Sequence, residues 1–294
     1  MANTRVLVRR RKAVRNTRKI TKTMERVSTA RLAKAQSAAL AARPYAGKLK
    51  EIIGSVASAG VRLEHPLLEV HERPKNAIVL VLTSDRGLCG AFNSNIVRLA
   101  RTLIADLKAK GRTLQFIVQG KKGIGAFKYL NLPIAERLIG VSDKPTYARA
   151  EGIADKMIAA YGKQELDEVY IVYSAFRSGT AQRPTQEMIL PLSALKGDET
   201  AAKAETPKGV TDYLFHPDPK RILAQVLPLV VEMALFTAML ENTASEHAAR
   251  RVAMKNATDN ADDMIRDLSQ AYNRARQGKI TREIAEIVGG ASAL

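Results

Sequence analysis

The chain has 294 residues, 46% of them hydrophobic, and its 47 lysines and arginines against 29 acids give a net charge of +18. The hydrophobic fraction is ordinary for a folded protein and excludes wholesale disorder. A single cysteine excludes an intramolecular disulfide and a multi-thiolate zinc site, and it indicates a reducing compartment. Charge of this sign is typical of proteins that bind nucleic acid, an anionic membrane or an acidic partner.

The positive charge is concentrated at the N-terminus. Residues 1–50 hold fifteen lysines and arginines and one acid, which gives +14, whereas residues 51–208 carry +5 and residues 209–294 carry −1. No apolar stretch of about 7–15 residues follows the basic start, so a secretory signal is excluded. The arginine content leaves a transit peptide open, but such a peptide does not merge into the helical pattern that follows.

A heptad pattern predicts one long helix over residues 1–58. From residue 35 onward, apolar residues recur in alternating steps of three and four. Ile20, Met24 and Val27 fall in the same phase before residue 35, and Arg31 is the one charged residue in that phase. The seam residues are Ala35, Ala38, Ala42, Tyr45, Leu49, Ile52 and Val56. Pro44 lies inside the pattern, which keeps its phase across it, so we expect a bend there rather than an end.

The middle of the chain alternates between strand and helix patterns. Residues 59–76 are expected to be a linker, and residues 77–208 to be a Rossmann-like α/β domain inserted between two long helices. Strands are predicted at 77–83, 114–118, 168–174 and, as an edge, 186–190; helices are predicted at 95–110 and 147–161.

Motifs for chemistry are weak throughout. The glycines and lysines from Gly120 to Gly125 match neither phosphate-loop spacing, so we interpret them as a solvated turn. Cys89 has no histidine nearby in sequence and is expected to be a small buried residue. The four histidines lack ligand spacing, and the acidic residues Asp259, Asp262 and Asp263 are expected to form a solvated face. The sequence therefore predicts no catalytic, cofactor-binding or metal-binding residues.

A second long helix is predicted within residues 209–294. It starts at Asp218 and Pro219, a capping carboxylate followed by a proline, and a helix from there to residue 289 would measure roughly 100 Å. The apolar window 222–240 is the one candidate for a membrane span, but a carboxylate and Pro228 within it favour a buried helix. Neither long helix can bury its row of apolar residues alone, so the two helices are predicted to pair as an antiparallel coiled coil.

Several strings of residues, in order along the whole chain, closely resemble the gamma subunit of F-type ATP synthases. They are NTRKITKTM (16–24), SDRGLCG (84–90), ASEHAAR (244–250), MKNATDN (254–260), YNRARQ (272–277) and ITREI (280–284). The resemblance implies a central-stalk rotor that couples proton-driven rotation of the c-ring to the cycling of the beta catalytic sites. The chain would be a non-catalytic subunit of a proton-translocating complex.

The resemblance also implies partners, cofactors and location. The partners are the alpha, beta and epsilon subunits and the c-ring, with no nucleic acid and no direct membrane span. No cofactor is expected on this chain, because ATP, ADP and Mg bind the alpha and beta partners. The location is the cytoplasmic face of the bacterial inner membrane, where the chain would be held through its partners.

Individual partner contacts come from the same resemblance. Met24, with Lys19 and Lys22 beside it, matches the position where torque passes to an acidic segment of beta. Contacts with the hexamer around the upper shaft are implied for Arg250, Arg276, Gln277, Thr281 and Glu283. For each of these residues, a purely structural place on a helix surface remains the alternative.

A basic coiled-coil protein that binds nucleic acid is the leading alternative function. Such proteins usually offer stacking aromatic residues, yet residues 1–50 contain only Tyr45. Recovery of the chain with nucleic acid, and without a hexameric ATPase, would favour this alternative.

Overall fold

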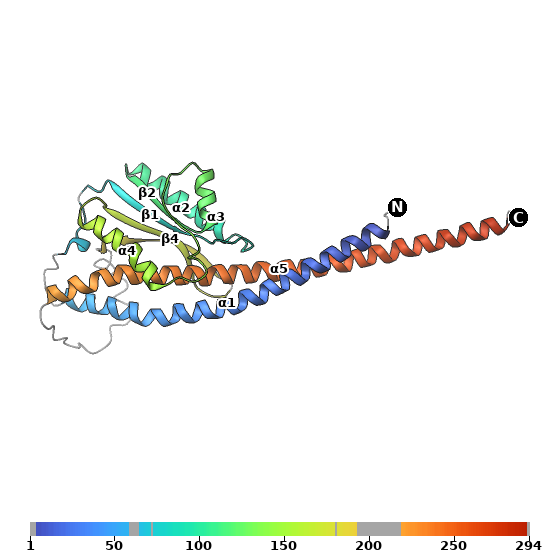
Figure 1. Ribbon diagram of the computed structural model, residues 1–294, viewed down its shortest axis with the longest axis horizontal. Coiled ribbons are helices and arrows are strands. Elements are labelled where there is room, and N and C mark those ends of the chain that lie inside the picture. The colour runs from blue at the N-terminus through green and yellow to red at the C-terminus, as the bar shows by residue number, and fades with distance from the viewer. Residues whose placement is uncertain (1–3, 59–64, 72, 180, 193–218, 293–294) are drawn as a thin grey trace. The chain divides into compact units, whose positions relative to one another are not determined.

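A computed structural model describes residues 4–58, 65–71, 73–179, 181–192 and 219–292 (Figure 1). The chain divides into two compact units, Met1–Thr29 with Arg250–Leu294 and Ala30–Ala249. Two long helices, α1 (Thr4–Ser58) and α5 (Pro219–Ser292), contribute to both units. The predicted division at residues 58, 76 and 208 stays a prediction, and its last boundary lies outside the described residues.

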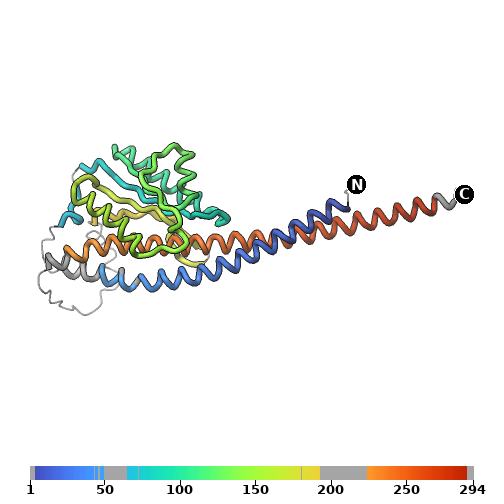
Figure 2. Tube along the Cα trace, viewed as in Figure 1, coloured from blue at the N-terminus to red at the C-terminus, as the bar shows by residue number. Residues whose placement is uncertain are grey.

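In the first unit α1 and α5 run antiparallel along each other (Figure 2). The hydroxyl oxygens of Thr21 and Thr258 form a buried hydrogen bond of 2.8 Å between the helices. Further toward the start of α1, Arg18 pairs with Asp262, and the Arg11 guanidinium lies 4.9 Å from the centre of the Tyr272 ring. These cross-helix contacts run in opposite directions along the two helices, as the predicted antiparallel coiled coil requires.

The inward face of α1 differs by one residue from the predicted seam over much of the helix. Ile20 and Val27 are 60% and 48% exposed, while Thr21 and Ser28 are buried. The buried or half-buried positions recur every seven residues, at Leu7, Val14, Thr21, Ser28, Ala35, Ala42 and Leu49. Small hydroxyl residues can fill a close helix contact because their oxygens bond back to the helix, as Thr21 does to the Arg18 carbonyl at 3.1 Å.

The second unit contains a five-stranded sheet with strand order β3-β2-β1-β4-β5. The strands are β1 (Asn76–Leu82), β2 (Thr113–Gln119), β3 (Ile134–Leu138), β4 (Glu168–Phe176) and β5 (Gln182–Leu190). The first four pair in parallel, and β5 pairs antiparallel to β4 at the edge. Short η1 (Pro66–Leu68) precedes the sheet, and the crossovers are α2 (Phe92–Ala109), α3 (Lys121–Tyr129) and α4 (Tyr147–Gly162).

Alternate residues of the central strands face two different hydrophobic cores. Val79 and Val81 point into the core built with α2 and α3. Leu80 and Leu82 point into the larger core, where α4, α5 and the part of α1 around Leu49 pack. Each strand is therefore buried on both sides, which explains the continuous apolar run that predicted β1.

The apolar stretch of α5 packs into the larger core. Leu227, Val231 and Leu235 are all nearly inaccessible there. Within the described residues, one helix is long and apolar enough to cross a membrane by length and composition, but half of its most apolar window is buried. That burial is what the buried-helix interpretation of this stretch expects.

Two elements of the domain were not predicted, namely α3 and β3. The interpretation of residues 120–125 as a solvated turn was wrong, because Gly120 is the N-cap of α3, with φ of 93°. A Cβ on Gly120 would lie 2.4 Å from the Thr83 carbonyl oxygen, and one on Gly123 would lie 2.5 Å from the Thr83 hydroxyl. These glycines let α3 start close against the end of β1.

Candidate functional site

An apolar stripe on α1 faces away from the helix seam in the first unit. Ile20, Met24 and Val27 follow one another at helical spacing; Met24 is half-buried, and the two flanking side chains are exposed. Large aliphatic side chains at this exposure leave apolar surface in water. The sequence pattern assigned Ile20 and Val27 to the seam, so this outward stripe emerged only from the structure.

Exposed cationic side chains lie on the same turns of α1 as the stripe. Lys19 and Arg26 are exposed, and Lys22 is exposed while pairing with Glu25 at 3.1 Å. An exposed pair at this spacing contributes only a few tenths of a kcal/mol. This segment of α1 therefore combines an exposed apolar stripe with cations on its other faces, which suits a partner segment that is both acidic and apolar.

The remaining predicted contacts lie on the part of α5 that belongs to the same unit. Arg276, Gln277, Thr281 and Glu283 are exposed, and Glu283 pairs with Lys279 at 3.3 Å. Arg250 differs from these four because it is only 6% exposed. The structure thus places four of the predicted residues at exposed positions of one helix and Arg250 inside the protein.

The acidic residues of α5 are more than a solvated face. Asp262 pairs with Arg18 across the seam, and Asp263 pairs with Arg266 on the same helix. Asp259 and Asp263 are exposed, as the prediction expects, whereas Asp262 is half-buried at the pair between the helices. The Arg18–Asp262 pair is one of the contacts between the two helices, and sequence spacing within one helix carries no signal of it.

In the second unit, α5 is hydrogen-bonded directly to the α/β domain. The Asn242 side-chain oxygen accepts from the backbone N–H of Ser174 at 3.0 Å, and the Glu241 carboxylate accepts from that of Phe176 at 3.3 Å. The Thr243 hydroxyl lies 2.8 Å from the Ser142 carbonyl oxygen. These side chains join the helix to the ends of the strands and to the loop before α4.

A further hydrogen bond joins α4 to α5. The Tyr147 hydroxyl donates to the carboxylate of Glu232, which is 6% exposed. Burial, and then this hydrogen bond, raises the pKa of Tyr147. The Tyr147 ring also meets Phe236 edge to face, with ring centres 5.8 Å apart. A buried carboxylate is costly without such a partner, so the bond favours one packing of the helix on the domain.

These contacts occupy the place where open α/β sheets usually bind ligands. That place is the crevice at the carboxyl ends of the strands where the order reverses, here between β1 and β4. Asn242, Ser245 and Glu246 of α5 are all fully buried. In this domain α5 is hydrogen-bonded to the carboxyl end of β4, one of the two strands beside this crevice.

The residues after β1 form a compact polar turn. Asp85 accepts from the backbone N–H of Lys121 at 3.1 Å and of Gly140 at 3.0 Å, which ties the turn to α3 and to the loop after β3. Cys89 is 2% exposed, as the sequence predicted, and its sulfur lies 3.2 Å from the Asn93 amide nitrogen. Among the described residues, no group of three or more His, Cys, Asp or Glu side chains has metal-binding geometry.

The fold and these surfaces define a class of protein: paired helices that carry an α/β domain and present an outward apolar and cationic surface to partners. The family model described as ATP synthase matches residues 3–294. The ATP synthase gamma chain of Gemmatimonas aurantiaca is 43% identical, covering 100% of this chain and 99% of the relative. That of Pelotomaculum thermopropionicum is 42% identical over the whole of both chains.

Solved structures share the fold at lower identity. The rotor of the Euglena gracilis mitochondrial ATP synthase has a TM-score of 0.64 and 20% identity, covering 94% of this chain and 98% of that one. The central stalk of the Tetrahymena thermophila enzyme has a TM-score of 0.59 and 22% identity, covering 81% and 99%. The chain therefore belongs to the ATP synthase gamma-chain family.

Proposed function

We propose that this chain is the central rotor shaft of an F-type ATP synthase and couples proton-driven rotation of a c-ring to the conformational cycle of beta-subunit catalytic sites. Family membership over the full length supports the role. In this proposal the chain carries no catalytic group, and ATP, ADP and Mg bind the alpha and beta partners. Its contribution is mechanical.

A shaft of this kind acts by contacting the alternative states of each catalytic subunit differently. A ligand or partner shifts a conformational equilibrium only as far as its interaction energies with the two states differ. The stripe formed by Ile20, Met24 and Val27 lies on one side of α1, with exposed cations on the other faces of the same turns. A one-sided surface presents itself to each surrounding subunit in turn as the shaft rotates.

In this proposal the α/β domain is the part of the chain that receives the torque. Asn242, Glu241 and Thr243 hydrogen-bond α5 to the domain, and Tyr147 adds a bond from α4. Torque applied to the domain can therefore pass into α5 through several short polar contacts together with the larger core. We propose that the domain sits with the epsilon subunit on the c-ring.

The proposed location follows from those partners. The complete set is the alpha and beta hexamer, the epsilon subunit and the c-ring, and the chain belongs to the F1 peripheral portion of the complex. Its relatives are bacterial gamma chains, which supports a place at the cytoplasmic face of the bacterial inner membrane, held through partners.

The observation that carries the contact assignment is the exposed apolar stripe around Met24. We propose that Met24, Lys19 and Lys22 meet an acidic segment of beta, and that Arg276, Gln277, Thr281 and Glu283 contact the hexamer along the upper shaft. The exposure of all these residues except half-buried Met24 supports such contacts. For Arg250, which is 6% exposed, the proposed role is to support the shaft from inside.

Met24→Lys tests this assignment in the assembled enzyme. The new ammonium would face the acidic segment and hold it too tightly, because close opposite charges near a protein surface interact by about 4 kcal/mol before desolvation. We expect ATP-driven proton pumping in membrane vesicles to fall severalfold more than ATP hydrolysis. Met24→Leu, which keeps the apolar side chain, should leave both rates near wild type.

Two results would contradict the proposal. Equal losses of pumping and hydrolysis, or no loss at all, would remove the role of Met24 in torque transfer while leaving the rotor function intact. Purification of the chain with nucleic acid and without a hexameric ATPase would instead support the nucleic-acid-binding alternative.

A further inference from the structure

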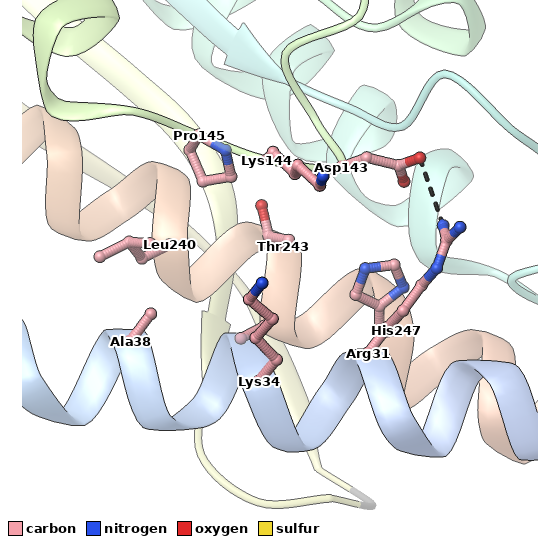
Figure 3. Close-up of a pocket in the computed structure, with 10 residues that line it drawn as sticks. Arg31, Lys34, Ala38, Asp143, Lys144, Pro145, Leu240, Thr243 and His247 are labelled. Atoms are coloured by element: carbon pink, nitrogen blue, oxygen red, sulfur yellow. Dashed lines mark hydrogen bonds and ion pairs between the residues drawn. The ribbon is translucent and has the colours of Figure 1, made fainter.

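A cavity of about 350 Å³ lies within the second unit. Three segments enclose it: α1 from Arg31 to Ala38, α5 from Leu240 to His247, and the loop 143–145 before α4. Figure 3 shows the loop on one side of the cavity and the two helices on the others. The cavity is therefore built where both long helices meet the α/β domain.

The walls of the cavity are mainly apolar. Ala35, Ala38, Leu240 and Pro145 contribute apolar surface, and Thr243 and His247 also line the cavity. The Thr243 hydroxyl lies within hydrogen-bond distance of the carbonyl oxygens of Ser142 and Met239, at 2.8 and 2.9 Å, so its hydrogen is already engaged. A ligand would meet mostly apolar walls, with the Thr243 hydroxyl oxygen and the His247 ring as polar groups beside them.

The charges at the rim are predominantly positive. Arg31, Lys34 and Lys144 border the cavity, and Asp143 is the only carboxylate in the lining. Asp143 is already occupied, because its oxygen lies 3.2 Å from Arg31 and 3.4 Å from Arg86. Among the described residues, neither Lys34 nor Lys144 has a carboxylate partner within ion-pair distance.

We propose that this cavity binds a small organic anion, with one carboxylate, sulfonate or phosphate group beside a short apolar body. The head group would lie between Lys34 and Lys144, and the body would lie against Ala35, Ala38 and Leu240. Apolar walls with a few convergent polar groups at the mouth are the usual composition of small-ligand sites. Opposite charges on the lysines complement the head group.

The volume of the cavity favours a small ligand as its occupant over a segment of a partner protein. Ligand sites usually measure about 300–1,000 Å³, which places this cavity at the small end. A partner helix has a diameter of about 10–12 Å with its side chains, too wide for a space of about 350 Å³ closed on three sides. The bound anion would contact α1, α5 and the domain together, so binding would stabilise their packing.

Fluorescence titration of the full-length chain with anilinonaphthalene sulfonate tests the proposal. This probe joins a sulfonate to an aromatic body and brightens in apolar surroundings. We expect saturable binding to one site, and displacement by octanoate but not by octanol. The uncharged analogue N-phenylnaphthylamine should bind at least tenfold more weakly, because it lacks the head group.

Variants locate the binding. The double variant Lys34→Gln with Lys144→Gln should weaken binding of the sulfonate at least tenfold, and Ala38→Phe should abolish it by filling the cavity. The matched control, Lys108→Gln with Lys128→Gln, removes two exposed lysines of the same domain outside the cavity and should bind like wild type. Circular dichroism of each variant checks that the helices form.

The proposal fails if the charged and uncharged probes bind equally, if the cavity variants and the control lose binding equally, or if no saturable binding occurs. Lysine acetylation of the assembled complex tests whether a partner protein, rather than a small anion, occupies the cavity. Protection of Lys34 and Lys144 in the complex, with no binding of the probe by the free chain, would identify a docking site for a partner protein and overturn the small-ligand proposal.

Discussion

Asp167 joins three parts of the α/β domain through one carboxylate. It accepts from the backbone N–H groups of Lys75 and Asn76 at 2.7 and 2.8 Å, and it hydrogen-bonds His71. The His71 ring in turn stacks on Tyr161, with ring centres 4.9 Å apart. Burial by itself would raise the pKa of Asp167, but these hydrogen bonds outweigh it and hold the pKa below 3.8.

Replacing Asp167 by Asn should therefore destabilise the domain in a pH-dependent way. A carboxylate whose pKa is depressed in the folded state contributes stability above its unfolded pKa and loses it as pH falls through the folded value. We expect Asp167→Asn to lower the free energy of unfolding by about 2 kcal/mol at pH 7. The difference from wild type should shrink below about pH 3.8, the ordinary value for this group.

Thermal unfolding followed by circular dichroism at pH 7, 5 and 3 would measure this difference. Asp155→Asn on α4 is the matched control, because Asp155 is exposed, and it should change the midpoint little at any of the three pH values. A loss of stability in Asp167→Asn that stayed constant down to pH 3 would show that the carboxylate charge is not what stabilises the strand ends.

The register of α1 is a property of the whole element, and two substitutions distinguish the observed register from the one the apolar pattern predicts. Leu32 is 6% exposed and packs against Phe176, Ala244 and Ala248, whereas Ile20 is 60% exposed. Leu32→Ala should lower the free energy of unfolding by about 2–4 kcal/mol, and Ile20→Ala by less than about 0.5 kcal/mol. Urea denaturation measures both.

The same pair of variants separates stability from partner binding. Ile20→Ala should weaken association with the alpha and beta hexamer although the free chain is as stable as wild type, because the lost side chain belongs to the outward stripe. If Ile20→Ala destabilised the chain as much as Leu32→Ala, the seam would follow the apolar pattern and the observed register would be wrong.

Sequence reasoning predicted the elements better than it predicted their faces. The two long helices were predicted from their helical patterns, and the central strands β1, β2 and β4 from their apolar runs. The α1 seam was misplaced because apolar residues were counted as inward, although Thr21 and Ser28 occupy the contact. An exact seven-residue recurrence from Leu7 to Leu49 was the signal that could have found it.

Short elements and cross-chain contacts were beyond the sequence for physical reasons. The helix α3 contains Gly123 and Gly125, which weaken any local helical signal, and it forms because its start packs against Thr83. The bonds from Asn242 to β4 and from Thr243 to the loop before α4 join residues more than 60 positions apart. Nothing within one element's pattern specifies such partners.

Charge is distributed over the molecule in a way that bears on assembly. Of the net +18, the first fifty residues supply +14, and the structure puts them on α1 around an apolar stripe. Fields from such a segment steer an oppositely charged partner and speed association, and salt screens them within about 10 Å at 0.1 M. The proposed partner is the acidic segment of beta.

Assembly of the chain with an alpha and beta hexamer should therefore slow as salt rises. At low ionic strength, Lys19→Gln with Lys22→Gln should slow association by about threefold to tenfold, since two charges beside the contact surface are removed. Near 1 M salt, where the Debye length is about 3 Å, the variant and wild type should associate at similar rates. Stopped-flow mixing with a labelled hexamer measures these rates.

The same loss of charge elsewhere provides the control. Lys108→Gln with Lys128→Gln leaves α1 unchanged, so association should slow far less than in the α1 variant, although the net charge of the two variants is identical. If both variants slowed association equally, only the total charge would matter. The placement of cations around Met24 would then have no part in guiding the shaft into its partners.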